Sequence, residues 1–599
     1  MIKYNKIKRH GETKTWVCVV EGYRPGPGLP PRQRTIKSFG YLEDQQDREA
    51  FIRKVREFNA HYKDDVELRI EVASNALMYT KGNRRQNYGY RFLQAVYGRL
   101  GIDEFIEAHE KSHRRRTGRE VGEIFRFLVL LRILSPGSKR ANSQLRDNFY
   151  GMDAHFTLTD IYRALDRVAC FESDLQRHLN EAVKGLIGRD MSHVFYDVTN
   201  FFFEIDFSDE EGGLRQRGVS KEHRMDPIVG LGLLMDANSL PVGMTVFPGN
   251  TAEATTLEPA MRDMKQSYGL GRLVVVADKA LNSSVNIDRI VNGGDGFVVS
   301  QPLRGTRGKR YQKMLFDKNG YIKNEDGSYR HKIFEEEYEG LDAEGRKVTR
   351  KRKVLIYWSR AEAARAHYKR EEKLKKAERA VRNGVYGIKR GVSEYVKEQV
   401  VVRETGECLD ESNVRKIRSV DNVKAENDAL YDGYYCIITS ELHYDEARIR
   451  AAYGGLWRIE QSFRVMKSDL YARPVFVWTG AHIRAHFLIC FTALLVARII
   501  QHRMGKKALS VERIATALSA ATCRVLKGGI VHLNDVGGAL AFKKIRNAKG
   551  ELVYSLEFSN EDQIALDYKL IQNTFGTDFY NVYPKQEVFN RFLKNISVS

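Results

Sequence analysis

The sequence lacks several features that mark familiar classes of protein. Its 599 residues include six cysteines, scattered without a Cys-x-x-Cys pair. This spacing argues against a zinc module or a disulfide framework and favours a reducing compartment. No Gly-x-x-x-x-Gly-Lys-Ser/Thr segment is present, so we expect no nucleotide hydrolysis. Fixed-period repeats and low-complexity tracts are also missing.

Long apolar runs are scarce as well. The most apolar helical stretch, residues 487–500, is shorter than the roughly 20 residues that span a bilayer, and Arg484 and Arg498 flank or interrupt it. We therefore expect a core helix there and no membrane partner. Residues 1–6 have no apolar run behind their charges, so we expect no secretory signal and a cytoplasmic protein.

What the sequence has in excess is positive charge. The 98 Lys and Arg residues outnumber the 77 Asp and Glu residues, which gives a formal net charge of +21. A chain this basic usually meets a polyanion. Its hydrophobic fraction of 42% excludes bulk disorder, and its length predicts roughly three to five structural units.

The spacing of apolar residues changes along the chain and predicts six regions. Alternating runs around a Pro/Gly-rich, basic tip predict a β-hairpin near the start, and a 3.6-residue period then predicts helices. Buried strands interleaved with a helix predict a mixed α/β sheet. The predicted regions are an N-terminal β-hairpin region (1–87), a helical region (88–188), the first part of an α/β core (189–302), a β-rich insertion (303–428), the second part of the core (429–507) and a C-terminal region (508–599).

Two aspartates follow apolar strands. Asp197 comes after His193-Val-Phe-Tyr196, and Asp278 comes after Leu273-Val-Val-Val-Ala277; we expect each to end its strand. Open α/β sheets place their ligands at the carboxyl ends of strands. A lone aspartate at such a position more often starts a turn, but two in one sheet favour a shared site.

A third acid lies in the segment 453–467. At 100° per residue, a continuous helix here carries a narrow stripe of aromatic, acidic and basic side chains. The stripe consists of Tyr453, Trp457, Glu460, Arg464 and Lys467. An acid and a cation four residues apart also fit an ordinary solvated face, so both interpretations stay open. Three carboxylates suit two Mg²⁺ ions, which prefer oxygen ligands and support in-line phosphoryl transfer.

Together these motifs resemble bacterial insertion-sequence transposases of the DDE type, in the branch with a Y-x2-R-x3-E-x6-K signature. The resemblance covers roughly residues 190–500. It implies an RNase H-like mixed-sheet catalytic core interrupted by a β-rich insertion, preceded by a β-hairpin and a helical DNA-binding region. The motifs that carry it are Tyr196-Asp197-Val-Thr199, Gly249-Asn250-Thr251, Val276-Ala-Asp278-Lys-Ala-Leu-Asn282 and the segment 453–467.

The resemblance also implies roles for individual residues. Asp197, Asp278 and Glu460 are the implied catalytic residues and ligands of Mg²⁺, for which Mn²⁺ can substitute. In the signature helix, Tyr453 and Lys467 would contact DNA phosphates near the cut.

Two further positions of the signature helix concern DNA at the transposon end. Trp457 lies where relatives place an aromatic beside a flipped base. The position of the signature Arg is Leu456 here, which puts in doubt the hairpin-forming step that this Arg supports in the family.

Basic runs supply additional candidate contacts to DNA phosphates. A run of this kind often forms only a solvated face, and on a chain of this net charge we weigh the two interpretations equally. The candidates are Arg114, Arg115, Arg116, Lys351, Arg352 and Lys353, together with Arg464 of the signature helix.

The sequence therefore predicts a DNA transposase. It would bind the terminal inverted repeats of its element, cleave beside them and join the 3′ ends to target DNA, as a homodimer assembled on DNA in the bacterial nucleoid. Two alternatives stay open: a metal-dependent nuclease of the same fold without strand transfer, and a catalytically inactive DNA-binding relative.

Overall fold

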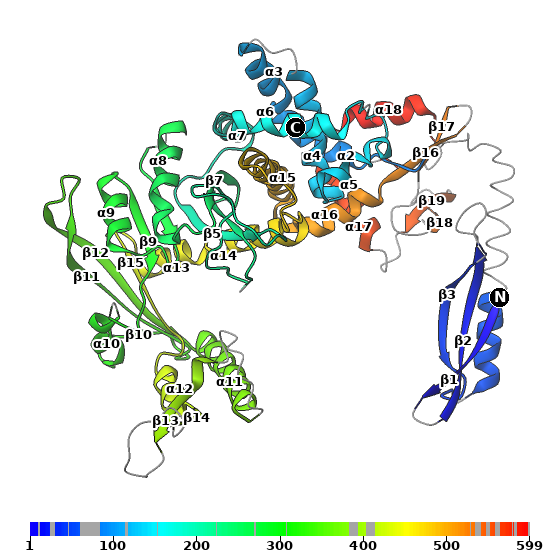
Figure 1. Ribbon diagram of the computed structural model, residues 1–599. Helices are drawn as coiled ribbons and strands as arrows, with labels where there is room; N and C mark the ends of the chain where they lie inside the picture. Colours follow the sequence, from blue (N-terminus) through cyan, green and yellow to red (C-terminus); the bar gives the residue numbers. More distant parts are fainter. Residues whose placement is uncertain are drawn as a thin grey trace. The chain divides into compact units, whose positions relative to one another are not determined.

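The structure is a computed structural model of the chain (Figure 1). It describes residues 1–9, 12–23, 30, 32–45, 47–59, 84–113, 118–152, 154–222, 224–268, 271–306, 308–382, 393–402, 414–526, 529–533, 541–546, 552–557, 563–577, 579 and 584–596. The chain divides into two units, each described by itself. One comprises Met1–Arg85, Cys523–Leu533 and Asn581–Phe589, and the other comprises the remaining residues.

The N-terminal unit is built on a three-stranded antiparallel sheet. Its strands are β1 (Ile2–Arg9), β2 (Glu12–Tyr23) and β3 (Arg32–Tyr41), in the order β1-β2-β3. Val17 and Val19 alternate onto the face that packs against Val55 of the following helix, residues 48–59. The predicted β-hairpin is confirmed as β2 and β3, while most of its basic tip lies outside the described residues.

Helices occupy the chain from Tyr90 to Ile187, as predicted. They are α2 (Tyr90–Arg99), α3 (Ile102–Ser112), α4 (Gly118–Leu134), α5 (Lys139–Ser143), α6 (Leu158–Cys170) and α7 (Glu172–Ile187). Helix α4 is buried on nearly every side because α2, α3, α6 and α15 all pack against it. The last two helices of this region, α6 and α7, are separated at Phe171.

The core is a nine-stranded mixed sheet in the order β10-β11-β12-β15-β9-β8-β5-β6-β7. Its strands are β5 (Val194–Phe202), β6 (Ile228–Met235), β7 (Pro241–Pro248), β8 (Val274–Ala277), β9 (Gly296–Ser300), β10 (Ile322–Lys323), β11 (Tyr329–Leu341), β12 (Lys347–Ser359) and β15 (Tyr434–Thr439). Strands β5, β6 and β7 form an antiparallel meander, and β8 and β9 continue parallel to β5. This order and direction define an RNase H-like core, so the predicted fold class is confirmed.

Helices and short strands complete the chain around this sheet. The helices are α8 (Leu257–Tyr268), α9 (Ser284–Asn292), α10 (Lys309–Phe316), α11 (Arg360–Arg382), α12 (Asn422–Ala429), α13 (Glu446–Gly454), α14 (Trp457–Arg464), α15 (Gly480–Met504), α16 (Val511–Ala520), α17 (Gln563–Thr574) and α18 (Gln586–Asn595). The remaining strands are β4 (Gln86–Asn87), β13 (Val396–Val402), β14 (Val414–Val420), β16 (Thr522–Leu526), β17 (Ile530–Leu533), β18 (Ala541–Arg546) and β19 (Leu552–Glu557).

Strand β5 is covered on both faces, and its alternation decides where Asp197 points. Tyr196 and Val198 belong to the core cluster that also contains apolar residues of α8 and α9. On the opposite face, the Arg458 guanidinium of α14 lies 5.7 Å from the Phe195 ring centroid, and Phe201 packs against α15. Because side chains alternate along a strand, Asp197 lies on the face toward α14 and α15.

Part of the predicted insertion extends the core sheet. The hairpin of β11 and β12 is paired along its whole length, and β12 pairs in turn with β15. Val354, Leu355 and Ile356 of β12 are fully buried, so burial against β15 fixes the position of the hairpin. The sequence pattern of short strands indicated β structure here but not the sheet to which it belongs.

Helix α15 contains the predicted core helix at 487–500. Among the described residues it is the one helix long and apolar enough to cross a membrane, and 94% of its apolar window is buried inside the protein. Such burial is what a core helix requires.

Candidate active site

Asp197 and Asp278 lie level with each other on neighbouring parallel strands. In the register of β5 and β8, Phe195 pairs with Val276, two residues before each aspartate. Asp278 directly follows the end of β8, as predicted. The predicted strand end at Asp197 is wrong, because β5 continues to Phe202 through its antiparallel pairing with β6.

The environment of Asp197 disfavours its charged form. Burial raises the pKa of this carboxyl to about 6, and the negative charges of Glu253 and Asp278 act in the same direction. The ammonium of Lys221 and the Val198 N–H, which donates to Oδ1 at 2.8 Å, oppose the shift. A cation between two neighbouring carboxylates relieves the repulsion between their charges. The oxygen donors of this pair therefore fit a divalent metal ion.

Asp278 is exposed but held by donors from three segments. Its Oδ1 accepts hydrogen bonds from the Lys279 N–H at 2.6 Å, the Ser300 hydroxyl at 3.4 Å and the Tyr453 hydroxyl at 3.5 Å. Ser300 ends β9, the next parallel strand. Burial is the main cause that raises the pKa of Tyr453, and the charge of Asp278 adds to it. The phenol therefore keeps its proton at neutral pH and donates a hydrogen bond to the Asp278 carboxylate.

The predicted continuous helix over 453–467 is divided in the structure. Helix α13 ends at Gly454, α14 begins at Trp457, and residues Val465–Asp469 form a π-helical turn. A Cβ atom at Gly455 would lie 2.3 Å from the Phe195 ring, so a glycine is needed where this segment crosses β5. Because the spacing is not 100° throughout, the predicted single stripe is not a regular helical face.

Glu460 is not joined to the two aspartates in this structure. It is exposed, lies in the first turn of α14, and makes no side-chain hydrogen bond or ion pair with any residue that the structure describes. Within the same residues, no group of three or more His, Cys, Asp or Glu side chains lies close enough to hold a metal ion. The structure thus brings Asp197 and Asp278 together, while Glu460 has no side-chain partner among the described residues.

The other residues of the signature helix take different positions. Trp457 is 56% exposed, whereas Leu456, at the position of the signature Arg, is 8% exposed. Arg464 is exposed. Lys467 is half-buried next to the first acid: burial and the charge of Lys221 lower its pKa to about 8, and Asp197 partly opposes this.

The long connection between β5 and β6, residues 203–227, supplies two site residues that sequence reasoning missed. Lys221 forms an ion pair with Glu253 (2.9 Å) and donates to the Val198 carbonyl. Glu222 contacts Lys467 at 3.3 Å and also Arg473. The available signal was length, because adjacent antiparallel strands usually need only about two to five connecting residues.

Gly249 fixes this connection to the end of β7. A Cβ atom there would lie 2.1 Å from the Ile228 carbonyl oxygen and 2.4 Å from that of Gln216. Its N–H donates to the Leu214 carbonyl at 3.1 Å. The motif Gly249-Asn250-Thr251 therefore supports the site through backbone packing.

The other basic candidates divide into two groups. Arg114, Arg115 and Arg116 lie outside the described residues. On β12, Lys351 is exposed, but Arg352 forms an ion pair with Glu336 and Lys353 donates to the Tyr444 carbonyl. Their contacts to DNA stay a prediction.

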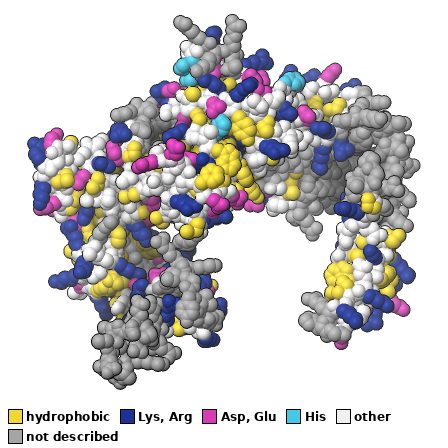
Figure 2. All heavy atoms as spheres, in the orientation of Figure 1, with side chains coloured by type: hydrophobic (Ala, Val, Ile, Leu, Met, Phe, Trp, Pro, Cys, Tyr) yellow, Lys and Arg dark blue, Asp and Glu magenta, His cyan; other side chains and the backbone are white. Residues whose placement is uncertain are grey.

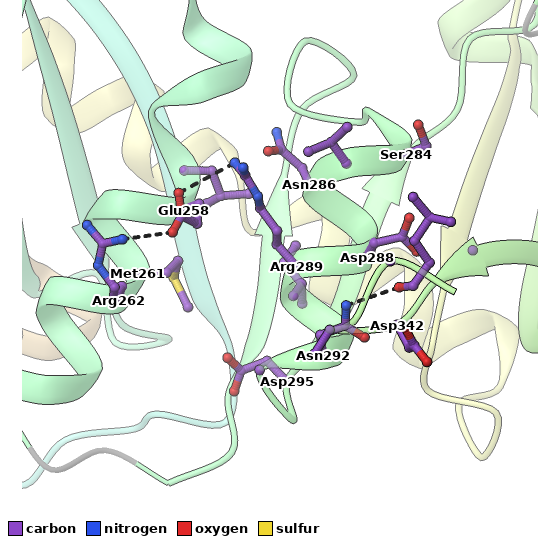
Figure 3. A pocket seen from close by; sticks show the side chains of 18 of the residues that line it. Glu258, Met261, Arg262, Ser284, Asn286, Asp288, Arg289, Asn292, Asp295 and Asp342 are labelled. Carbon is purple, nitrogen blue, oxygen red and sulfur yellow. Dashed lines mark hydrogen bonds and ion pairs between the residues drawn. The ribbon is translucent and has the colours of Figure 1, made fainter. Parts of the chain in front are cut away.

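Charge at the surface does not by itself locate a DNA site. Figure 2 shows Lys and Arg side chains distributed over the visible face. A cavity of about 860 Å³ between α8, α9 and the β11–β12 hairpin contains none of the predicted site residues (Figure 3). Glu258 in this cavity is already paired with Arg262 and Arg289. The acids of β5 and β8 are thus the chemically distinctive centre.

Part of this fold matches a known family of protein domains. Residues 228–496 match the family model of the transposase DDE domain. This match, over 269 of the 599 residues, supports a DDE transposase. Asp278 and Glu460 lie within the matched residues, and Asp197 lies before them. No curated protein matches the sequence.

Among solved structures, the chain is similar to a piggyBac transposase determined by cryo-electron microscopy in a synaptic complex with hairpin DNA. The similarity covers 73% of this chain and 82% of that one, at 9% identity and a TM-score of 0.32.

Proposed function

We propose that the protein is a bacterial insertion-sequence transposase that binds terminal inverted repeats, cleaves at the transposon ends and joins the 3′ ends to target DNA. The observation that carries this proposal is the level position of Asp197 and Asp278 on adjacent parallel strands, next to and within a transposase DDE domain. Carboxylates at such a place suit metal-assisted phosphoryl transfer.

Asp197, Asp278 and Glu460 would hold Mg²⁺, or Mn²⁺ in its place. When bound, the metal ions activate the attacking oxygen and stabilise the leaving one. Tyr453 holds Asp278 by its hydroxyl, and Lys467 places a cation beside Asp197. Glu460, in the first turn of α14, has no partner among the described residues to keep it from the pair.

Strand joining is the test that separates a transposase from a nuclease of the same fold. Purified protein, Mg²⁺, DNA carrying pre-cleaved transposon ends and a target plasmid should yield joined product. Cleavage of uncut ends without any joining would leave the nuclease alternative. Absence of metal-dependent cleavage by folded, DNA-bound protein would instead establish the inactive relative. A homodimer on DNA predicts two protein chains per paired-end complex.

A further inference from the structure

One carboxylate, that of Glu222, binds two cations from a separate part of the chain. Its Oε1 lies 3.3 Å from Lys467 Nζ and also contacts the Arg473 guanidinium. The side chains are only 13%, 26% and 29% exposed for Lys467, Arg473 and Glu222, respectively, so water screens them less than it screens surface pairs. A carboxylate between two such cations occupies the place of an anion with oxygen acceptors, such as a phosphate group.

The two cations have supports that do not depend on Glu222. Lys467 Nζ lies 5.5 Å from the Phe201 ring centroid, and the Arg473 guanidinium lies 5.8 Å from that of Phe202. Each ring attracts the cation near it. The cations can therefore stay in place when the connection that carries Glu222 moves.

Lys221, the residue before Glu222, places a positive charge near the acidic residues of the site. Lys221 contacts Glu253, and its charge opposes the raised pKa of Asp197. Neighbouring residues of one connection thus give the acidic side of the site a cation and the basic side an anion. A site prepared for metal ions and DNA needs such compensation while both are absent.

We propose that Lys467 and Arg473 form a binding site for a phosphate group of the DNA backbone, and that Glu222 occupies this site until DNA displaces it. The inference rests on the proposed function, which supplies the DNA. The proposal adds Arg473 as a DNA-binding residue. It also means that the Glu222 carboxylate, on the connection between β5 and β6, competes with DNA phosphate for Lys467 and Arg473. DNA binding then includes release of Glu222 and movement of this connection.

The decisive variant is Glu222→Gln, which keeps the size of the side chain and removes its charge. Binding of a fluorescein-labelled duplex of arbitrary sequence is measured by anisotropy in EDTA over a series of salt concentrations. We expect Glu222→Gln to bind about 5- to 10-fold more tightly, because phosphate no longer competes with a carboxylate. Arg473→Gln should bind more weakly and reduce the slope of log K against log salt by about one.

Glu258 provides a matched control. Its carboxylate also lies between two cations, Arg262 at 3.0 Å and Arg289 at 3.4 Å, and it is 33% exposed (Figure 3). Glu258→Gln should leave DNA affinity unchanged. The double variant Glu222→Gln, Arg473→Gln should lose most of the increase in DNA affinity seen in Glu222→Gln. This increase depends on the Arg473 guanidinium that the loss of the Glu222 charge makes available to phosphate.

Two results would overturn the proposal: affinity of Glu222→Gln equal to that of the wild type, or a double variant that keeps the full gain. If Glu222→Gln does not fold, Arg473→Gln decides alone, and unchanged affinity and salt slope refute the phosphate site. These measurements contain no metal. If the variants change DNA binding as expected but the protein never cleaves DNA with Mg²⁺, the proposed transposase function is refuted and the phosphate-binding site is not.

Discussion

The Tyr453 hydroxyl donates to Oδ1 of Asp278 at 3.5 Å and thereby ties the second acid to helix α13. This helix leads directly into α14, which carries Glu460. Residues 175 positions apart in the chain thus share one hydrogen bond at the centre of the site. The contact gives the signature Tyr a local function in addition to the phosphate contact implied by the family resemblance.

Removal of any of the three acids should abolish chemistry without abolishing DNA binding. We expect Asp197→Asn, Asp278→Asn and Glu460→Gln each to lower metal-dependent end cleavage by about 10³-fold or more, because each is proposed to hold metal. Binding to a transposon-end duplex in EDTA should stay within about 3-fold of the wild type, since carboxylates do not attract phosphates. Cleavage is measured on labelled ends in gels.

Glu253→Gln is the matched comparison for these variants. Glu253 lies near enough to raise the pKa of Asp197 but is paired with Lys221. We expect Glu253→Gln to retain about a tenth to a hundredth of wild-type cleavage, since a residue that does not bind the metal itself acts indirectly. If Glu253→Gln loses cleavage and Glu460→Gln keeps it, the third metal-binding acid would be Glu253 and not Glu460.

Stability of the metal-free protein should fall as pH rises through the titration of Asp197. Burial raises its folded-state pKa from 3.8 to about 6, so its favourable contribution is complete below pH 4 and is lost as pH rises through 6. The full loss should be about 3 kcal/mol in the free energy of unfolding, of which about 2 kcal/mol falls between pH 4.5 and pH 7.5. Urea unfolding in EDTA at pH 4.5 and pH 7.5 measures it.

Asp197→Asn should remove this pH-dependent component and be the more stable protein at pH 7.5. Parallel stability profiles of the wild type and Asp197→Asn over this range would show that Asp197 does not titrate there. Addition of Mg²⁺ at pH 7.5 should stabilise the wild type more than Asp197→Asn, because a ligand of the folded state stabilises it by mass action.

Gly249→Ala should destabilise the catalytic unit strongly. The added methyl group would lie 2.1 Å from the Ile228 carbonyl oxygen, so the backbone must move, at a cost of about 2–4 kcal/mol. Gly185→Ala in helix α7 is the control, because a Cβ atom there meets no atom within 4 Å. It should stabilise by about 0.5–1 kcal/mol through helix propensity. Equal melting temperatures for the two variants would contradict the packing argument.

Trp457→Ala should separate DNA contact from folding. Since Trp457 is 56% exposed, its removal should change the free energy of unfolding by less than about 1 kcal/mol. If the indole stacks on a base, affinity for an end with an unpaired base should fall about 5- to 100-fold. Tyr368→Ala on α11, 68% exposed, should leave that affinity unchanged. Equal effects of the two variants would exclude stacking by Trp457.

Much of the fold was accessible from the sequence because local patterns carry it. Apolar periodicity correctly predicted the helical region, the strands of the core and the buried helix α15. The position of Asp278 also followed from a short apolar run that ends at the acid. Local patterns did not show that β5 continues beyond Asp197, because that extension depends on pairing with β6.

The sequence by itself determined which residue types are present for chemistry: two strand acids, a helix acid with aromatic and basic neighbours, and an excess of positive charge. Only the tertiary structure decided that Asp197 and Asp278 lie level, that Glu253 and Lys221 stand beside them, and that Glu222 binds Lys467 and Arg473. The physical reason is that these relationships arise from strand register and from a long connection folding back over the sheet. Both bring together residues whose separation along the chain contains no signal of contact.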